Sequence, residues 1–353
     1  MSQTLVLEAA GRSASAGTRP EPATQSRAWL ISERADYWIV CAGGASLLVV
    51  MGLVLLWHGD RELDTADLLL SELHLGATYE AIVRRGLWRR MPLDVLAVPF
   101  AILIGTYGLV LNGWPLVVTT TVLYLGAWHR GRQNLGIARH YQRHVGGPVS
   151  PAHRWLLGMA FYLPMVAAVA YYTSTSPTTE SGEDFHHLTL GPDVLWGLGA
   201  LAAASVVAYL IWTIGRTVAI GDGAQSAGEP ADVGVHPAER WLVLANAAAF
   251  GSAYVVGAWS VSFILVLAVH HEVQYLYFTY AIARGEDASR RHGLVPELRR
   301  LARFAMWPLI GLASWAACMY SGIEALLPFL TAGLLSHYWL DGRIWTARAR
   351  RLG

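Results

Sequence analysis

Long runs of apolar residues, separated by short polar stretches, follow one another along most of this 353-residue chain. Most runs have about the 20 residues that an α-helix needs to cross a bilayer. The pattern therefore predicts an all-α fold, a multi-pass transmembrane helical bundle. We count ten candidate spans: Tyr37–Trp57, Asp67–Arg85, Leu93–Asn112, Leu116–Arg139, Arg154–Tyr172, Asp193–Ile214, Ala238–Val256, Ser260–Arg284, Arg303–Ser321 and Ile323–Arg343.

The second candidate span is the weakest, because Glu72, His74 and Glu80 interrupt its apolar run. Its alternative is a re-entrant helix or a helix buried within the bundle. Glu72 and Glu80 are themselves candidate intramembrane carboxylates, with packing against Arg84 as the alternative.

Polar segments flank the apolar runs and divide the chain into three parts. Residues 1–36 are rich in Ser, Ala, Thr, Pro and Arg and lack the apolar stretch of a secretory signal, so we expect a mobile cytoplasmic tail. Residues 37–346 form the transmembrane helical domain, and residues 347–353 form a basic cytoplasmic tail.

Arginine is distributed unevenly between the two sides of the predicted membrane. If the N-terminus is inside, the outer segments hold only Arg61, whereas the inner segments and span ends hold most other arginines. Cytoplasmic loops are enriched in Arg and Lys. We therefore expect both termini in the cytoplasm and the protein in the cell inner membrane or plasma membrane. A missing span would invert every later loop, so the asymmetry also supports the second span.

The composition excludes several classes of protein. Apolar residues make up 54% of the chain and charged residues 14%, with a mean hydropathy of +0.37, which argues against a soluble enzyme and against disorder. The formal charge of +1 gives no indication of a nucleic-acid partner. No lysine is present, which excludes a Schiff base and a Walker A motif. Cys41 and Cys318 lie in separate apolar runs, and such isolated cysteines favour neither a disulfide framework nor a thiolate metal site.

Several of the 13 histidines lie inside apolar spans, where an ionisable side chain is costly and marks a candidate functional site. These spans are the second, fourth, eighth and tenth, which all run from outside to inside. Helices of one direction can bring their histidines to one depth. We therefore predict one intramembrane metal site formed by His74, His129, His270, His271 and His337. His140 is the next candidate ligand, because it lies eleven residues beyond His129 on the same helix face.

Three of these histidines have a polar residue four positions later, on the same helix face. The pairs are His129 with Gln133, His270 with Gln274, and His337 with Asp341. Such a partner can be a second ligand or can orient the imidazole. Gln133 and Gln274 are thus candidate cofactor-binding residues, and Glu272 and Asp341 are candidate catalytic carboxylates.

Neutral imidazoles bind iron, copper and zinc. Five or more histidines exceed one zinc tetrahedron and fit a mono- or di-iron centre that activates dioxygen, with copper and haem ranked below iron. The alternative for each histidine is a hydrogen bond to a neighbouring helix or, for His129, an interfacial position beside Arg130. We expect the remaining histidines to be solvated, in loops, at span ends or on the inner surface: His58, His144, His153, His186, His187, His236 and His292.

The candidate ligands resemble those of the histidine-rich integral-membrane non-haem iron oxygenases, the desaturases and hydroxylases of lipids and hydrocarbons. The boxes of that family read H-x-x-x-H or H-x-x-H-H, whereas this chain has H-H-x-x-Q, H-x-x-x-Q and H-x-x-x-D, and its one literal H-x-x-x-H is His140–His144. The set is similar also to bacterial membrane carotenoid-cleaving dioxygenases, which place histidines around iron in a membrane bundle. The resemblance implies iron, a small hydrophobic substrate entering from lipid or from the cytoplasmic face, and a cytosolic electron donor at the arginine-rich side.

The leading hypothesis is an integral-membrane, metal-dependent oxidoreductase, a non-haem iron oxygenase or desaturase. Two alternatives remain open: a haem protein with two axial histidines, and a transporter that moves protons or metal ions along intramembrane His and Glu. A transporter predicts inverted repeats, and we find no internal repeat.

The ten-span topology predicts that reporter fusions placed after Pro192 and after Arg216 report opposite sides of the membrane, because one span separates them. Reporter activity in intact cells measures this directly. Two fusions on the same side would contradict both the topology and the shared depth of the histidines.

Overall fold

A computed structural model of the chain describes residues 29–41, 61–145, 149–176, 184–221, 235–256, 262–288 and 327–345, with isolated positions between 298 and 316. Within these residues every regular element is helical, which confirms the predicted all-α class. The α-helices are α1 (Glu33–Ala35), α3 (Arg61–Arg84), α4 (Leu87–Arg90), α5 (Val98–Leu111), α6 (Pro115–Val145), α7 (Pro151–Thr175), α8 (Pro192–Gly221), α9 (Pro237–Phe250), α10 (Ser262–Ala288) and α12 (Leu327–Ile344). Short π-helical turns are η2 (Asp36–Cys41), η3 (Leu93–Ala97) and η4 (Gly251–Val256).

Proline and glycine set several of the helix ends. Proline is the first residue of α6, α7, α8 and α9. At this position its missing N–H costs nothing and its fixed φ suits a helix. Gly86 and Gly113 have φ of 61° and 78°, in the left-handed region that favours glycine. They lie in the tight turns between α3 and α4 and between α5 and α6.

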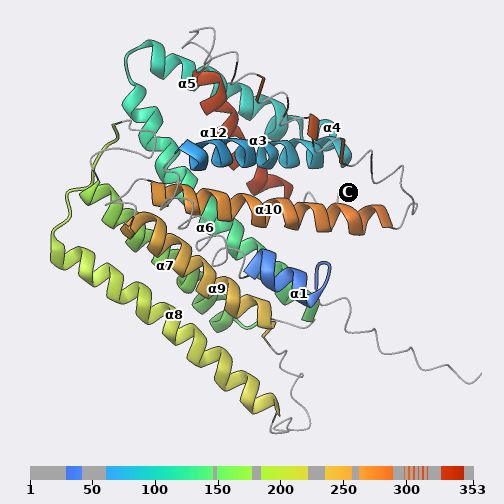
Figure 1. The fold of residues 1–353 in the computed structure, drawn as a ribbon, viewed down its shortest axis with the longest axis vertical. Coiled ribbons are helices and arrows are strands. Elements are labelled where there is room, and N and C mark those ends of the chain that lie inside the picture. Colours follow the sequence, from blue (N-terminus) through green and yellow to red (C-terminus); the bar gives the residue numbers. More distant parts are fainter. Residues whose placement is uncertain are drawn as a thin grey trace, which may run out of the picture.

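The helices form two groups that α6 connects (Figure 1). In one group α3 packs against α10 and α12, and α12 packs against α5. In the other, α7 packs between α8 and α9. Helix α6 contacts α5 and α12 on one side and α7 and α9 on the other. Residues of α6 can therefore meet residues of α3 and α12 at the junction of the two groups.

Three helices are long and apolar enough to cross a membrane: Leu93–Leu111, Pro151–Thr175 and Pro192–Arg216. They coincide with the third, fifth and sixth predicted spans. Each of them leaves large apolar side chains uncovered, such as Leu111, which is 80% exposed, Trp155, which is 71% exposed, and Trp196, which is 79% exposed. Exposed apolar faces of this kind are uncommon on soluble proteins and suit contact with lipid.

The other predicted spans divide into two sets. Helices form at the second, fourth, seventh, eighth and tenth. Among the residues that the structure describes, none of these five meets the length and hydropathy of a membrane span, so their crossing remains a prediction. The first and ninth spans lie largely outside the described residues.

Asp36 joins the described N-terminal segment to the bundle. Its buried carboxylate accepts hydrogen bonds from the backbone N–H groups of Leu30 (2.6 Å) and Ile31 (3.3 Å). It also accepts from the hydroxyls of Tyr141 on α6 (2.9 Å) and Tyr277 on α10 (2.7 Å). One carboxylate therefore links three parts of the chain.

Part of the segment that the composition assigned to a mobile tail contacts the bundle. Trp29 and Leu30 lie against a core cluster that includes Tyr141 and Leu157. The carboxylate of Asp36 explains this contact, because it holds the backbone of Leu30 and Ile31 although the sequence before Asp36 has no apolar run. Residues 1–28 and the predicted tail 347–353 lie outside the described residues.

Asp36→Ala should destabilise the protein by about 3–5 kcal/mol, because it leaves two tyrosine hydroxyls and two backbone donors without their buried acceptor. Chemical denaturation of the detergent-solubilised chain measures the change. The exposed Asp184 provides the control, and Asp184→Ala should change stability by less than about 0.5 kcal/mol. Equal stability of the two variants would contradict the role of Asp36.

Candidate metal centre

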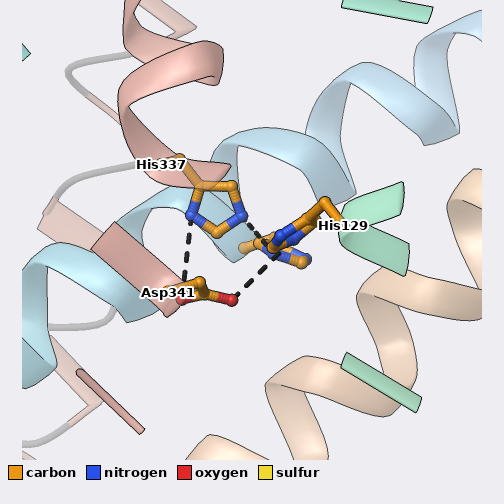
Figure 2. Close-up of side chains that lie close together, drawn as sticks. His129, His337 and Asp341 are labelled. Atoms are coloured by element: carbon orange, nitrogen blue, oxygen red, sulfur yellow. Dashed lines mark hydrogen bonds and ion pairs between the residues drawn. The ribbon is translucent and has the colours of Figure 1, made fainter. Parts of the chain in front are cut away.

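Four side chains from three helices meet at the junction of α3, α6 and α12. His74 lies on α3, His129 on α6, and His337 and Asp341 lie on α12. One ligand atom from each lies within 4.8 Å of the other three, and this group is called the histidine–aspartate cluster below. Figure 2 shows His129, His337 and Asp341 pointing toward one another. All four residues are at most 6% exposed.

The two ligand candidates on α12 share a face because they are four residues apart. The other two reach them from helices that pack against α12. The separation of His74 and His337 in sequence is 263 residues. Polar groups in such a buried position are stable only when they are paired. The cluster therefore needs partners within itself or a bound cation.

The rings of His74 and His337 meet nitrogen to nitrogen. Their Nε2 atoms are 2.7 Å apart, and the rings are nearly perpendicular, at 83°. A neutral imidazole has one N–H and one lone pair. One ring can therefore donate to the other, or both lone pairs can turn to a common cation.

Asp341 uses its two oxygens differently. Oδ1 accepts from the hydroxyl of Thr78 at 2.8 Å and from that of Tyr275. Oδ2 lies 3.8 Å from Nε2 of His129. Two ligands bound at about 2.0–2.2 Å from one metal are about 3–4 Å apart. This pair therefore has a separation that suits shared coordination, whereas the Nε2 atoms of His74 and His337, at 2.7 Å, would have to move slightly apart to bind one ion.

A fourth imidazole borders the histidine–aspartate cluster. The ring of His271 on α10 stacks on His74 at a centroid distance of 4.7 Å and lies edge-on to His129 at 5.1 Å. Two tyrosines complete the lining, because Tyr275 stacks on His74 at 4.1 Å and Tyr338 stacks on His129 at 4.7 Å. These contacts restrict the rotation of the imidazoles.

The histidine–aspartate cluster fits a metal ion on its unpaired atoms. Within the described part of the chain, Nε2 of His129, the nitrogen that faces Asp341, is buried without a hydrogen-bond partner. Nδ1 of His74 is also unpaired, but the nitrogen of His74 that meets His337 is Nε2. Each unsatisfied buried group costs about 1–3 kcal/mol. A cation bound by imidazole nitrogens and a carboxylate offsets such costs, and three nitrogens with one oxygen form a donor set that suits a divalent transition metal.

Two predicted ligands, His140 and His270, are not among the four side chains that meet in the cluster. His140 is partly exposed and contacts Phe278 at a ring distance of 5.1 Å. It lies about 16 Å along α6 from His129 at about 1.5 Å per residue, too far to share a metal ion with it. His270 is buried, but neighbouring residues on a helix point about 100° apart. The ring contacts with the cluster come from His271 instead.

The predicted polar partners other than Asp341 join helices. Gln133 donates to the backbone carbonyl of His271 at 3.3 Å, and Gln274 donates to the carbonyl of Val40 at 2.8 Å. Glu272 is buried and accepts from the hydroxyl of Ser71 on α3. Of the three residues predicted from i+4 spacing, Asp341 is a candidate ligand. The side-chain amides of Gln133 and Gln274 donate to backbone carbonyls instead.

Thr78 and Tyr275 belong to the site but were missed by the sequence analysis. Thr78 follows His74 by four residues, and Tyr275 follows His271 by four. The same rule would have found them had hydroxyls been considered with amides and carboxylates.

A second buried polar group lies on α7, α8 and α9. His153, predicted to be solvated, is 3% exposed and binds Glu239, which also accepts from the hydroxyl of Tyr209. His236 was also predicted to be solvated, but it is 2% exposed and accepts from the N–H of Ala238 at the start of α9. Both predictions were wrong. The partner of His153 lies on α9, which packs against α7, and His236 accepts a backbone hydrogen bond as the cap of α9.

Comparison with known proteins gives no further guide to the site. No protein-family model, curated protein or solved structure matches this chain.

His129→Ala and His337→Ala should each lower the affinity for a divalent metal by more than about 100-fold. Losing a residue that only contacts a ligand costs about 10–100-fold, and losing the ligand itself should cost more. Metal content after dialysis, measured by mass spectrometry, tests this. His153→Ala is the matched control: it removes an equally buried histidine, so it should reduce stability while metal stoichiometry is unchanged. Equal metal loss in all three variants would show that the effect is unfolding.

Proposed function

We propose that this chain is an integral-membrane, metal-dependent oxidoreductase, a non-haem iron oxygenase or desaturase acting on a small hydrophobic substrate. The observation that carries the proposal is the buried histidine–aspartate cluster with converging imidazole nitrogens. It also rests on the resemblance of the histidine set to membrane iron oxygenases.

The donor set supports iron. Two histidines and one carboxylate are the ligands of many non-haem iron(II) oxygenases, and the cluster offers these groups with one further imidazole. A bound iron ion would supply the binding and activation of dioxygen. The protein residues would hold that ion away from bulk water, because every member of the set is buried.

The surroundings of the cluster support a hydrophobic substrate. Aromatic rings of Tyr275 and Tyr338 cover two of the imidazoles. Helix α5 packs against α12, which carries two ligand candidates, and α5 exposes large apolar residues such as Phe100 and Ile104. A substrate dissolved in lipid would therefore meet α5 near the site.

Haem is a weaker alternative on geometric grounds. Two imidazole nitrogens bound to opposite faces of a haem iron are about 4 Å apart, twice a metal–nitrogen bond of about 2 Å. The Nε2 atoms of His74 and His337 are 2.7 Å apart. This separation leaves no room for a porphyrin between them.

The test is purification of the full chain in detergent, reconstitution with iron(II) without oxygen, and measurement of oxygen uptake when oxygen and extracted membrane lipids are added together with a chemical reductant. The reductant supplies the two electrons that a desaturase or monooxygenase needs for each oxygen molecule. We expect about one or two iron ions per chain, oxygen uptake that depends on lipid, and products with an added oxygen atom or a new double bond. His337→Ala should abolish uptake, and His186→Ala, at an exposed position, should retain it. A Soret band with stoichiometric haem would overturn the proposal, as would iron-loaded protein that consumes no oxygen with any lipid fraction while the reductant is present.

A further inference from the structure

The hydroxyl of Thr78 lies at the centre of three polar contacts behind the histidine–aspartate cluster. Its Oγ1 is 2.8 Å from Oδ1 of Asp341, 2.9 Å from Nδ1 of His337 and 2.9 Å from the hydroxyl of Tyr275. Thr78 is fully buried, so water does not compete for these positions.

The protons available to these groups fix their roles. A threonine hydroxyl has one proton, and an ionised carboxylate only accepts. In the ionised form in which Asp341 binds a metal, Thr78 donates to its Oδ1. The oxygen of Thr78 then accepts from Nδ1 of His337, which must carry the ring proton. The lone pair of His337 is therefore on Nε2, the nitrogen that faces His74.

Tyr275 fixes the carboxylate in the same way. Its hydroxyl donates to the same Oδ1 of Asp341, and its ring is held parallel to His74 at an interplanar angle of 10°. The two donors occupy the lone pairs of Oδ1. Oδ2, which faces Nε2 of His129, remains for a metal ion.

We propose that Thr78, assisted by Tyr275, is a positioning residue that selects Nε2 of His337 and Oδ2 of Asp341 as the metal-binding atoms. This inference rests on the proposed metal centre and names how the chain orients two of its ligands. Outer partners of this kind fix the tautomer and the direction of metal ligands.

The test uses the affinity of the purified full chain for zinc and iron(II), measured by competition with a chelator. Thr78→Val keeps the shape but removes the hydroxyl, so we expect affinity to fall by about 10–100-fold. Thr78→Ser keeps the hydroxyl and should restore most of that affinity. Thr279→Val is the matched control on α10, because Thr279 is similarly buried but donates only to backbone carbonyls of its own helix. It should bind metal as the wild type does.

A second measurement needs no variant at Thr78. In the zinc-loaded wild type, nitrogen-15 NMR should show a proton on Nδ1 of His337 and zinc at Nε2, with His337→Gln identifying the signals. Zinc at Nδ1 would overturn the inference even if Thr78→Val fails to fold. Wild-type affinity in Thr78→Val would overturn it while leaving the metal centre intact, whereas a wild-type chain that binds no metal would overturn both.

Discussion

The contact between α3 and α12 is the constraint on which the site depends. His74 and Thr78 are one turn apart on α3, and they meet His337 and Asp341, one turn apart on α12. Polar groups buried among apolar helices are costly when unpaired. Two helices with matching polar pairs therefore have one favoured register, since a shift by a single residue would turn His337 and Asp341 about 100° away from their partners on α3.

The helices and part of this site follow from sequence because both depend on local pattern. An apolar run of sufficient length predicts a helix whatever it packs against, and a helix forms in the region of eight of the ten predicted spans. His74, His129 and His337 stood out because ionisable residues are costly inside apolar runs. Asp341 could be predicted from helix periodicity alone, because it lies four residues after His337 and therefore on the same face of one helix.

The remaining parts depend on pairs that no local pattern contains. The acceptor of Thr78 lies 263 residues away, and that of Tyr275 lies 66 residues away. His153 is followed by an arginine and lies at the start of a helix, which indicates solvent, yet it is buried against Glu239 because α7 and α9 pack together. His140 was predicted as a ligand because it lies on the same face of α6 as His129. That face extends along α6 away from the junction with α3 and α12, so the local pattern is correct but the distance is too great.

Burial alone does not distinguish a candidate metal site from a structural polar pair, but the composition of two buried histidine groups in the described part of the chain differs. His153 and Glu239 are one imidazole and one carboxylate in direct contact, and the hydroxyl of Tyr209 donates to the same carboxylate. The histidine–aspartate cluster has three imidazoles for one carboxylate, with a fourth imidazole from His271 beside it. Protonating more than one of these rings would bury like charges a few ångströms apart, which is strongly unfavourable. If the rings are neutral, His74 and His337 can pair with each other, but Nε2 of His129 is still buried without a hydrogen-bond partner. A cation shared with Asp341 would occupy that position.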